Sequence, residues 1–590
     1  MGLVRLLLPL PRAAARLGPG PGRRLLGAAL TRCLAPDWVL LRPPPPERRL
    51  AWAEEATAVY RALAGREDAR PRDRDLLARA LVWHAYTLVL VDRCEQACAV
   101  LDASTAVPGA RWPPAQRALL LHLRAQARYG LARPDDALGP AGECVAAYRR
   151  LVPARRERSL GGLPGALRTY ALVLAALDRT EESVAAYEEC AGLLRAMSVR
   201  ELSRATLVRV RVLCELTAGL VELGRHEQAL SVGREAREAA DAVMVRVAPE
   251  IVRPLRVRLF TDLARCLEVT GDPSAARATA EEAVTEARTL VPGRATALRE
   301  RTAGQPLLVM ALDCLADRLR ETGCLARELK IRREAVELSA GLAAEWPAVH
   351  EPLHAVCLER LADCHRAAGD RRGAVRAEER AVAAYRRAAD RDPTAQEPQL
   401  ARVLEDLSLL RQDDGDHGGA VGDAREAVVL TRRLAGADRT AHHVLTARRL
   451  RVLGRALRGA GDPGAAVACC TQSESILTDA SEGPGAGRYE ASLAATRTGL
   501  ALALDGEARA HLADGRADDA VAALRSLLAL TRRTDGTRVH ARCVTVFAHA
   551  RAEYGESVVP AWTRATGQGF PTFVYRPSGA VDGERPPGGN

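Results

Sequence analysis

The sequence predicts an all-α protein built as a solenoid of about ten antiparallel helix pairs. The first observation is a turn followed five residues later by a small residue, which recurs about every 46 residues. The second is composition: alanine, leucine, valine and arginine dominate, and only 3% of residues are aromatic, which favours helix over strand. The third is length. A chain of 590 residues is too long for one compact domain, so an array or several domains is expected.

The small residue after each turn serves as the marker of one repeat. The motifs run from "VDRCEQA" to "DGRADDA", and most turns contain glycine. The ten markers are Ala97, Ala137, Ser183, Ala229, Ala276, Glu328, Ala374, Ala420, Ala466 and Ala520. Their successive spacings are 40, 46, 46, 47, 52, 46, 46, 46 and 54 residues. This regularity indicates tandem repeats.

Other positions keep the phase of the markers. Seven residues after the marker stands a small residue, which in two early repeats is Cys144 or Cys190. Twelve residues before the markers stand Ala85, Ala125, Ala171, Thr217, Ala264, Ala316, Ala362, Ser408, Gly454 and Ala508. Each repeat is therefore interpreted as two amphipathic helices, A and B, joined at the turn, where glycine supplies the left-handed conformation that ends helix A. One such pair cannot bury both apolar faces, so pairs must stack.

This spacing of glycine, two alanines and an earlier small residue resembles the tetratricopeptide repeat. The resemblance covers about residues 73–530 and is most specific from Leu216 to Ala466. The unit is 46 residues instead of about 34, which is similar to the long-helix variety in kinesin light chains and actinobacterial arrays. The HEAT repeat fits by length alone and ranks second. The resemblance implies a right-handed superhelical α-solenoid that binds a peptide or protein segment in a concave groove.

The rest of the chain is divided by composition. The partner of the first helix would run through Pro43–Pro46, which cannot be helical, so that helix is expected to be an orphan or a cap. The expected parts are 1–46, a basic, proline- and glycine-rich disordered leader; 47–66, the orphan helix or cap; 71–480, the array; 481–490, a linker; 491–555, the final helices; and 556–590, a proline- and glycine-rich tail. Phe570 and Phe573 suggest a short aromatic docking motif in this tail.

Charge and cysteine usage narrow the class of protein. Residues 1–50 hold nine arginines against Asp37 and Glu47, and the remaining 540 residues are nearly neutral, which lacks the basic stripe of a nucleic-acid binder. No stretch reaches the ~18–20 apolar residues that span a bilayer, so no stable membrane insertion is expected. A weak membrane-surface contact of the leader is the alternative.

The fourteen cysteines form no C-x-x-C pair, which indicates reduced thiols in a cytoplasmic protein. The arginine-rich, almost lysine-free composition indicates an actinobacterial genome.

The motifs of common enzymes are absent. The only lysine, Lys330, lies between Leu329 and Ile331, so the sequence has no phosphate-binding G-K-[ST] loop and no kinase or S-x-x-K lysine. We therefore expect no catalytic residues and no cofactor.

One sequence, His350-Glu351-Pro352-Leu353-His354, fits the zinc-protease pattern H-E-x-x-H. Pro352 stands twenty-two residues before its marker, as Pro254, Pro306 and Pro398 do. These prolines are interpreted as helix starts, which would leave His350 and Glu351 in a loop and His354 in the first helical turn. A zinc site is not expected, and a metallopeptidase is the remote alternative.

The resemblance implies that exposed positions of helix A face the groove. In the clearest repeats these are Asp313, Asp317, Arg320, Glu359, Asp363, Arg366, Glu405, Leu409, Arg451, Arg455 and Arg458. The groove would be acidic at its centre and basic in the next repeat, which could orient a peptide with one basic and one acidic end. An ordinary solvated helix face explains the same charges equally well.

The sequence thus predicts a non-catalytic scaffold or adaptor for a protein or peptide partner. The alternative is a peptide-sensing regulator whose superhelix changes pitch on binding. Neither the identity of the partner nor the oligomeric state follows from the sequence.

Overall fold

The computed structural model describes residues 21–34, 46–67, 69–151, 162–196, 199–244, 249–291, 298–435, 439–481, 489–532 and 537–571. All secondary-structure elements in these residues are α-helices. The chain divides into two compact units, residues 1–295 and 296–590. In the described ranges no helix has both the length and the apolar character that crossing a bilayer requires.

The first unit contains the helices α3 to α15. Their bounds are α3 Pro21–Leu34, α4 Pro46–Ala64, α5 Pro71–Leu90, α6 Cys94–Thr105, α7 Pro114–Gly130, α8 Pro134–Leu151, α10 Leu163–Ala175, α11 Thr180–Arg195, α12 Val199–Glu222, α13 His226–Met244, α14 Pro249–Val269 and α15 Pro273–Thr289. The second unit contains α16 to α26. Their bounds are α16 Leu298–Glu321, α17 Leu325–Glu345, α18 Pro347–Ala367, α19 Arg371–Ala389, α20 Pro393–Asp414, α21 His417–Ala435, α22 Arg439–Gly459, α23 Pro463–Ser481, α24 Glu490–Ala513, α25 Ala517–Arg532 and α26 Thr537–Thr566.

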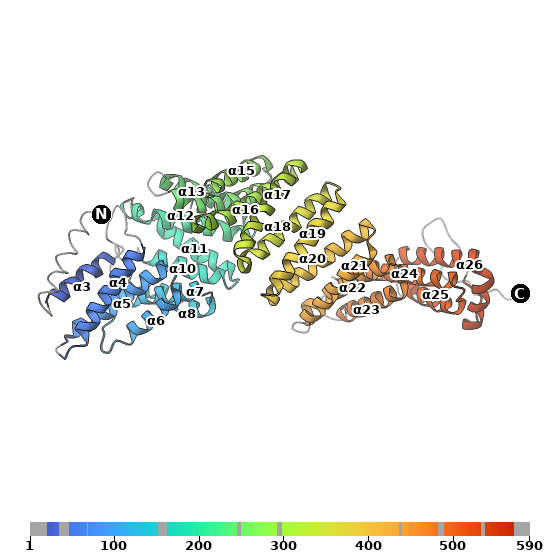
Figure 1. The fold of residues 1–590 in the computed structure, drawn as a ribbon, viewed down its shortest axis with the longest axis horizontal. Helices are drawn as coiled ribbons and strands as arrows, with labels where there is room; N and C mark the ends of the chain where they lie inside the picture. The colour runs from blue at the N-terminus through green and yellow to red at the C-terminus, as the bar shows by residue number, and fades with distance from the viewer. Residues whose placement is uncertain are drawn as a thin grey trace. The chain divides into compact units, whose positions relative to one another are not determined.

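Within each unit, helices that follow one another in the chain pack against each other (Figure 1). A short turn joins the A and B helices of each repeat, as between α18 and α19, and the two therefore run antiparallel. Several A helices also contact the next A helix, as α12 contacts α14 and α20 contacts α22. The predicted all-α solenoid of helix pairs is confirmed.

The small positions lie at the contact between the two helices of a pair. All ten markers are buried, with at most 3% of their surface exposed, and so are the residues twelve positions earlier. Cys144 and Cys190 fill the small slot seven residues after the marker, as predicted. Their thiols donate to the carbonyls of Ala118 and Pro164 at 3.3 Å, on the A helices of their own pairs.

The turn that ends helix A requires a positive φ angle. In the last seven repeats glycine occupies it: Gly224, Gly271, Gly323, Gly369, Gly415, Gly461 and Gly515, with φ between 70° and 90°. In the first three repeats Asp92, Ala132 and Asp178 adopt the same conformation, with φ between 56° and 60°. The turn geometry is therefore kept even where the sequence does not provide the residue best suited to it.

The N-terminal part differs from the predicted disordered leader and orphan helix. Residues 21–34 form α3, which packs on α4, so α4 has a partner. Leu26 and Leu30 are spaced by one turn and are buried against Trp52 and Ala53. The prolines Pro43–Pro46 led to the expectation that α4 has no partner, but α3, further upstream, fills that role. Residues 1–20 and 35–45 lie outside the described residues.

The C-terminal part is ordered beyond the predicted boundary at residue 555. Helix α26 continues to Thr566 through a kink at Tyr554. Phe570, which follows the helix, is buried against Phe547 and Trp562, with ring centroids 5.4 and 5.5 Å away. These contacts give the expected tail an apolar anchor. Phe573 and the centre of the predicted linker, residues 482–488, lie outside the described residues.

The interpretation of the repeated prolines as helix starts is wrong. Pro254, Pro306, Pro352 and Pro398 all lie inside helices. In three of these helices another proline, five residues earlier, begins the helix, as Pro347 begins α18. Proline is most favourable at the first helical position, and in these three helices the earlier proline occupies it.

We predict opposite effects of alanine at two glycines of the second unit. Gly369 has φ of 74° and no atom near the position of an added Cβ, so Gly369→Ala should lower the free energy of unfolding by about 1 kcal/mol through backbone strain alone. Gly341 also faces open space but lies inside α17, so Gly341→Ala should raise it by about 0.5–1 kcal/mol. Urea unfolding of both variants checks this. Equal signs would contradict the left-handed turn.

Candidate functional site

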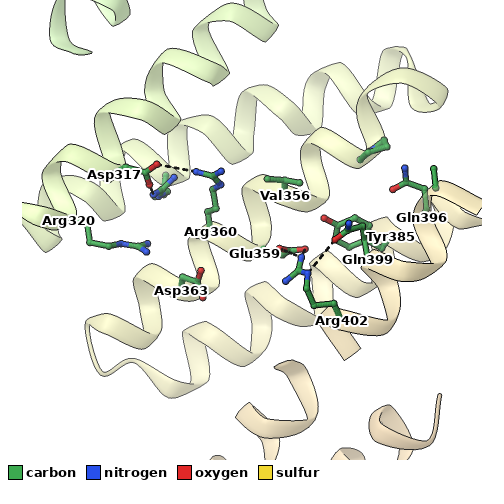
Figure 2. Close-up of a pocket in the computed structure, with 13 residues that line it drawn as sticks. Asp317, Arg320, Val356, Glu359, Arg360, Asp363, Tyr385, Gln396, Gln399 and Arg402 are labelled. Carbon is green, nitrogen blue, oxygen red and sulfur yellow. Dashed lines mark hydrogen bonds and ion pairs between the residues drawn. The ribbon is translucent and has the colours of Figure 1, made fainter. Parts of the chain in front are cut away.

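A cavity of about 670 Å³ lies along the A helices α16, α18 and α20 of the second unit (Figure 2). Four of the residues that the sequence placed in the groove line it, namely Asp317, Arg320, Glu359 and Asp363. Its walls are completed by Arg332, Pro352, Val356, Arg360, Tyr385, Ala395, Gln396, Gln399 and Arg402. The structure therefore brings the central part of the predicted set together.

At the α16 end the carboxylates are neutralised by two arginines. Arg332, on α17, is only 2% exposed and donates to both Asp313 and Asp317. Arg360, on α18, lies 2.6 Å from Asp313 and 3.2 Å from Asp317. Two negative and two positive groups make this end of the cavity close to neutral. The prediction of an acidic centre is wrong at this end, because Arg332 comes from the B helix α17 and Arg360 from the next A helix, α18.

The marker Glu328 explains how Arg332 and Arg320 are positioned. It is the only charged marker, and it is fully buried. Arg320 donates to its carboxylate at 2.9 Å, and the Nε of Arg332 lies 3.5 Å from the same oxygen. A buried carboxylate needs such partners, so this exception to the small-residue rule holds both arginines beside the cavity.

At the α18–α20 end another ion pair closes the wall. Arg402 donates to both carboxylate oxygens of Glu359, at 2.7 and 2.6 Å, and lies 3.3 Å from Asp406. Burial first, and then the Glu359 carboxylate, raise the pKa of the Tyr385 phenol. Figure 2 shows Glu359, Arg402 and Tyr385 in contact, and Asp363 beside the cavity.

Glu378, on α19, is a buried carboxyl beside this wall that the sequence analysis missed. It is 4% exposed. Burial, together with the negative charges of Asp406, Glu359 and Asp363, raises its pKa to about 9, and Arg366 opposes this only in part. The Glu378 carboxyl is therefore protonated at neutral pH. Within the described part of the chain it forms no ion pair and no hydrogen bond.

We predict that Glu378→Gln makes stability less dependent on pH. Because the pKa is raised in the folded state, the stability that Glu378 provides is complete below its unfolded pKa of 4.5 and is lost as pH rises towards 9. The variant should match the wild type near pH 4.5 and unfold at higher urea at about pH 8, by about 1 kcal/mol or more, since one pKa unit is about 1.4 kcal/mol. The exposed Glu337→Gln is the control. Parallel pH profiles of the wild type and Glu378→Gln would contradict the raised pKa.

The remaining predicted groove residues have other surroundings. Glu405 is buried and accepts from Arg448 at 2.6 Å. Leu409 packs against the hydrophobic core of α21–α24. Arg366 pairs with Asp363, and Arg455 lies 2.9 Å from Asp413. Arg451 and Arg458, on α22, form no ion pair among the described residues.

The H-E-x-x-H sequence lies within α18, not in a loop followed by a helix start. His350 and His354 are therefore one turn apart on one helix. The other contacts differ from those of a zinc site: Glu351 is buried and pairs with Arg387 at 2.5 Å, and His354 is buried with its Nδ1 3.0 Å from the Ser339 hydroxyl. Burial lowers the pKa of His354. No group of three or more potential ligands is close enough to hold a metal in the described ranges.

We predict that the two adjacent arginines of α19 differ in their contribution to stability. Arg387→Ala leaves the buried Glu351 carboxylate with only Arg391, 3.6 Å away, and should lower the free energy of unfolding by about 1–3 kcal/mol. Arg386→Ala removes an exposed pair with Glu426 and should change it by less than about 1 kcal/mol. Urea unfolding measures both. A larger effect at Arg386 would show that Glu351 is not stabilised by its pair.

Comparison with known proteins gives structural similarity only. No protein-family model matches the chain, and no curated protein matches its sequence. Similar solved structures include a signal-transduction ATPase with a tetratricopeptide repeat sensor from Pyrococcus horikoshii, at 12% identity and a TM-score of 0.42, covering 80% of this chain and 71% of that one. A Rap protein complexed with Competence and Sporulation Factor has 12% identity and a TM-score of 0.38, covering 70% and 99%. BtubC from P. vanneervenii has 19% identity and a TM-score of 0.33, covering 43% and 91%.

These similarities are too low to support an argument about function. The assignment of the fold rests on the helix pairs themselves, with a left-handed residue at each turn and a buried small residue at nearly every contact. These features of the helix pairs confirm the predicted tetratricopeptide type of repeat.

Proposed function

We propose that this array of tetratricopeptide-type helix pairs is a non-catalytic scaffold that binds an extended peptide or protein segment in the cavity of α16, α18 and α20. The observation that supports it most is the cavity itself, which is open, extends over three successive A helices and is lined by four of the predicted groove residues. Such a site suits a segment of several residues better than a small molecule, which is usually enclosed on most sides.

The chemistry of the wall suits a peptide. Gln396 and Gln399 carry amides, which can both donate to and accept from a peptide backbone. Val356 and Pro352 add apolar surface to the wall. The acids and arginines are already paired with one another, which supports recognition of a ligand by charge and shape instead of acid–base catalysis.

We predict that a single substitution in the cavity removes peptide binding. A displayed library of random linear twelve-residue peptides is panned against the full chain, and the enriched peptides are measured by fluorescence polarisation. Val356→Arg, which fills the cavity, should weaken them at least tenfold. Val349→Arg is the control, because Val349 is on the same helix, is 67% exposed and does not line the cavity. No enrichment, or equal binding by both variants, would refute the proposal.

A peptide-sensing regulator is the alternative form of the same function. It requires that binding changes helix pairs away from the cavity. Hydrogen exchange with and without an enriched peptide separates the two. Protection confined to α16–α20 supports a passive scaffold, whereas changes that reach α22–α26 support a sensor.

A further inference from the structure

Two successive repeats carry the same four charged positions with different charges. The first set is Asp313, Asp317, Arg332 and Arg360, and exactly one 46-residue repeat later the second set is Glu359, Asp363, Glu378 and Asp406. We call them the paired site and the acidic site. Both sites keep two carboxylates on helix A, but the two arginines of the paired site become carboxyls in the acidic site.

The paired site shows what this arrangement of helices can hold. The guanidinium of Arg332 lies in the interior and donates to both helix-A carboxylates. The planar fork of a guanidinium can reach two carboxylates at once, which an ammonium does less well. In eight of the ten repeats the position of Arg332, four residues after the marker, is uncharged. A charge there is specific to these two repeats.

The acidic site has the corresponding carboxylates and no internal guanidinium. Glu378, in the place of Arg332, is buried, lacks a partner in the described residues, and faces Glu359 and Asp363 from α18 and Asp406 from α20. The two nearby cations are arginines with partly exposed side chains. Arg366 forms an exposed pair with Asp363, and Arg402 is about half exposed where it binds Glu359. Exposed pairs of this kind contribute little, so Arg366 can be displaced from Asp363.

We propose that the acidic site binds the guanidinium of an arginine side chain in the bound segment, in the manner in which the paired site holds Arg332. Asp363 and Glu359 line the cavity, so a side chain that enters from the cavity meets them first. A metal ion fits less well, because the described residues contain no group of three or more ligands at metal-binding distances. This inference rests on the proposed function only in taking the arginine from a bound segment.

Binding should release a proton. Glu378 is neutral when the site is empty, for the reasons given above, and a guanidinium beside it favours the charged carboxylate. The groups that face it are Glu359, Asp363 and Arg366 on α18 and Asp406 on α20. Affinity for the cation should therefore increase as pH rises from about 6 to about 9, where Glu378 loses its proton more easily.

The test uses N-acetyl-arginine amide as the probe and its neutral isostere N-acetyl-citrulline amide as the control, with the full chain, by ligand-observed NMR. The arginine probe should bind the wild type, the citrulline probe at least tenfold more weakly, and the affinity for arginine should rise at least threefold between about pH 6 and pH 8.5. Glu378→Gln should remove this pH dependence.

Glu378→Arg is the sharper variant, because it restores the residue of the preceding repeat. It should occupy the acidic site itself, raise the melting temperature and weaken the arginine probe at least tenfold. Glu337→Arg, on the exposed face of α17, is the matched control and should leave binding unchanged. Should Glu378→Arg fail to fold, Glu378→Gln decides the outcome alone, through the pH dependence of binding.

The two proposals fail separately. Equal binding of arginine and citrulline, or binding that neither Glu378 variant changes, overturns the acidic site even if the displayed library yields peptides that Val356→Arg abolishes. Arginine binding that depends on Glu378, with no enriched peptide, supports the acidic site and counts against the peptide scaffold.

Discussion

The whole structure depends on the close approach of the two helices in each pair. Two helices can come this near only if the residues at their contact are small, and the markers and their partners twelve residues earlier are accordingly buried alanine, serine, threonine or glycine in nearly every repeat. The short turn sets where the contact falls, and it takes a left-handed conformation even at Asp92, Ala132 and Asp178. The small residues therefore recur in the sequence because the same close distance between the two helices of a pair is repeated along the chain.

The one exception to this rule introduces a buried network of charges beside the cavity. Glu328 places a carboxylate where other repeats have a small residue, and a buried charge is tolerated only with partners. Arg320 and Arg332 supply them, and Arg332 in turn requires Asp313 and Asp317. The presence of Glu328 instead of a small residue at the contact is therefore connected to a network of charges that reaches the cavity wall. The spacing before this repeat is also irregular, at 52 residues.

The sequence was informative where one residue type has one physical role. Small residues and turn glycines predicted the helix pairs, and the register carried four groove residues to the cavity. It failed where two residues competed for a role, as with the two prolines of α18, of which the earlier begins the helix. It also failed where neutralisation came from a different helix, because Arg332 and Arg360 are not on the A helix that carries the carboxylates they neutralise. Leu26 and Leu30 indicated a helix in the leader, but the flanking prolines and glycines obscured them.

The charge change between the paired and acidic sites has a consequence for stability as well as for recognition. A carboxyl buried among carboxylates makes the empty site less stable than its neighbour, most of all above neutral pH, where its proton is lost. Uncharged residues fill this position in eight of the ten repeats at no such cost. The buried carboxyl lowers the stability of the fold when the site is empty, and a guanidinium that enters the site supplies the missing counter-charge. Stability is therefore coupled to ligand binding, because a ligand that binds only the folded state stabilises it. The same coupling discriminates between ligands, since a neutral side chain in that place leaves the carboxyls without a counter-charge.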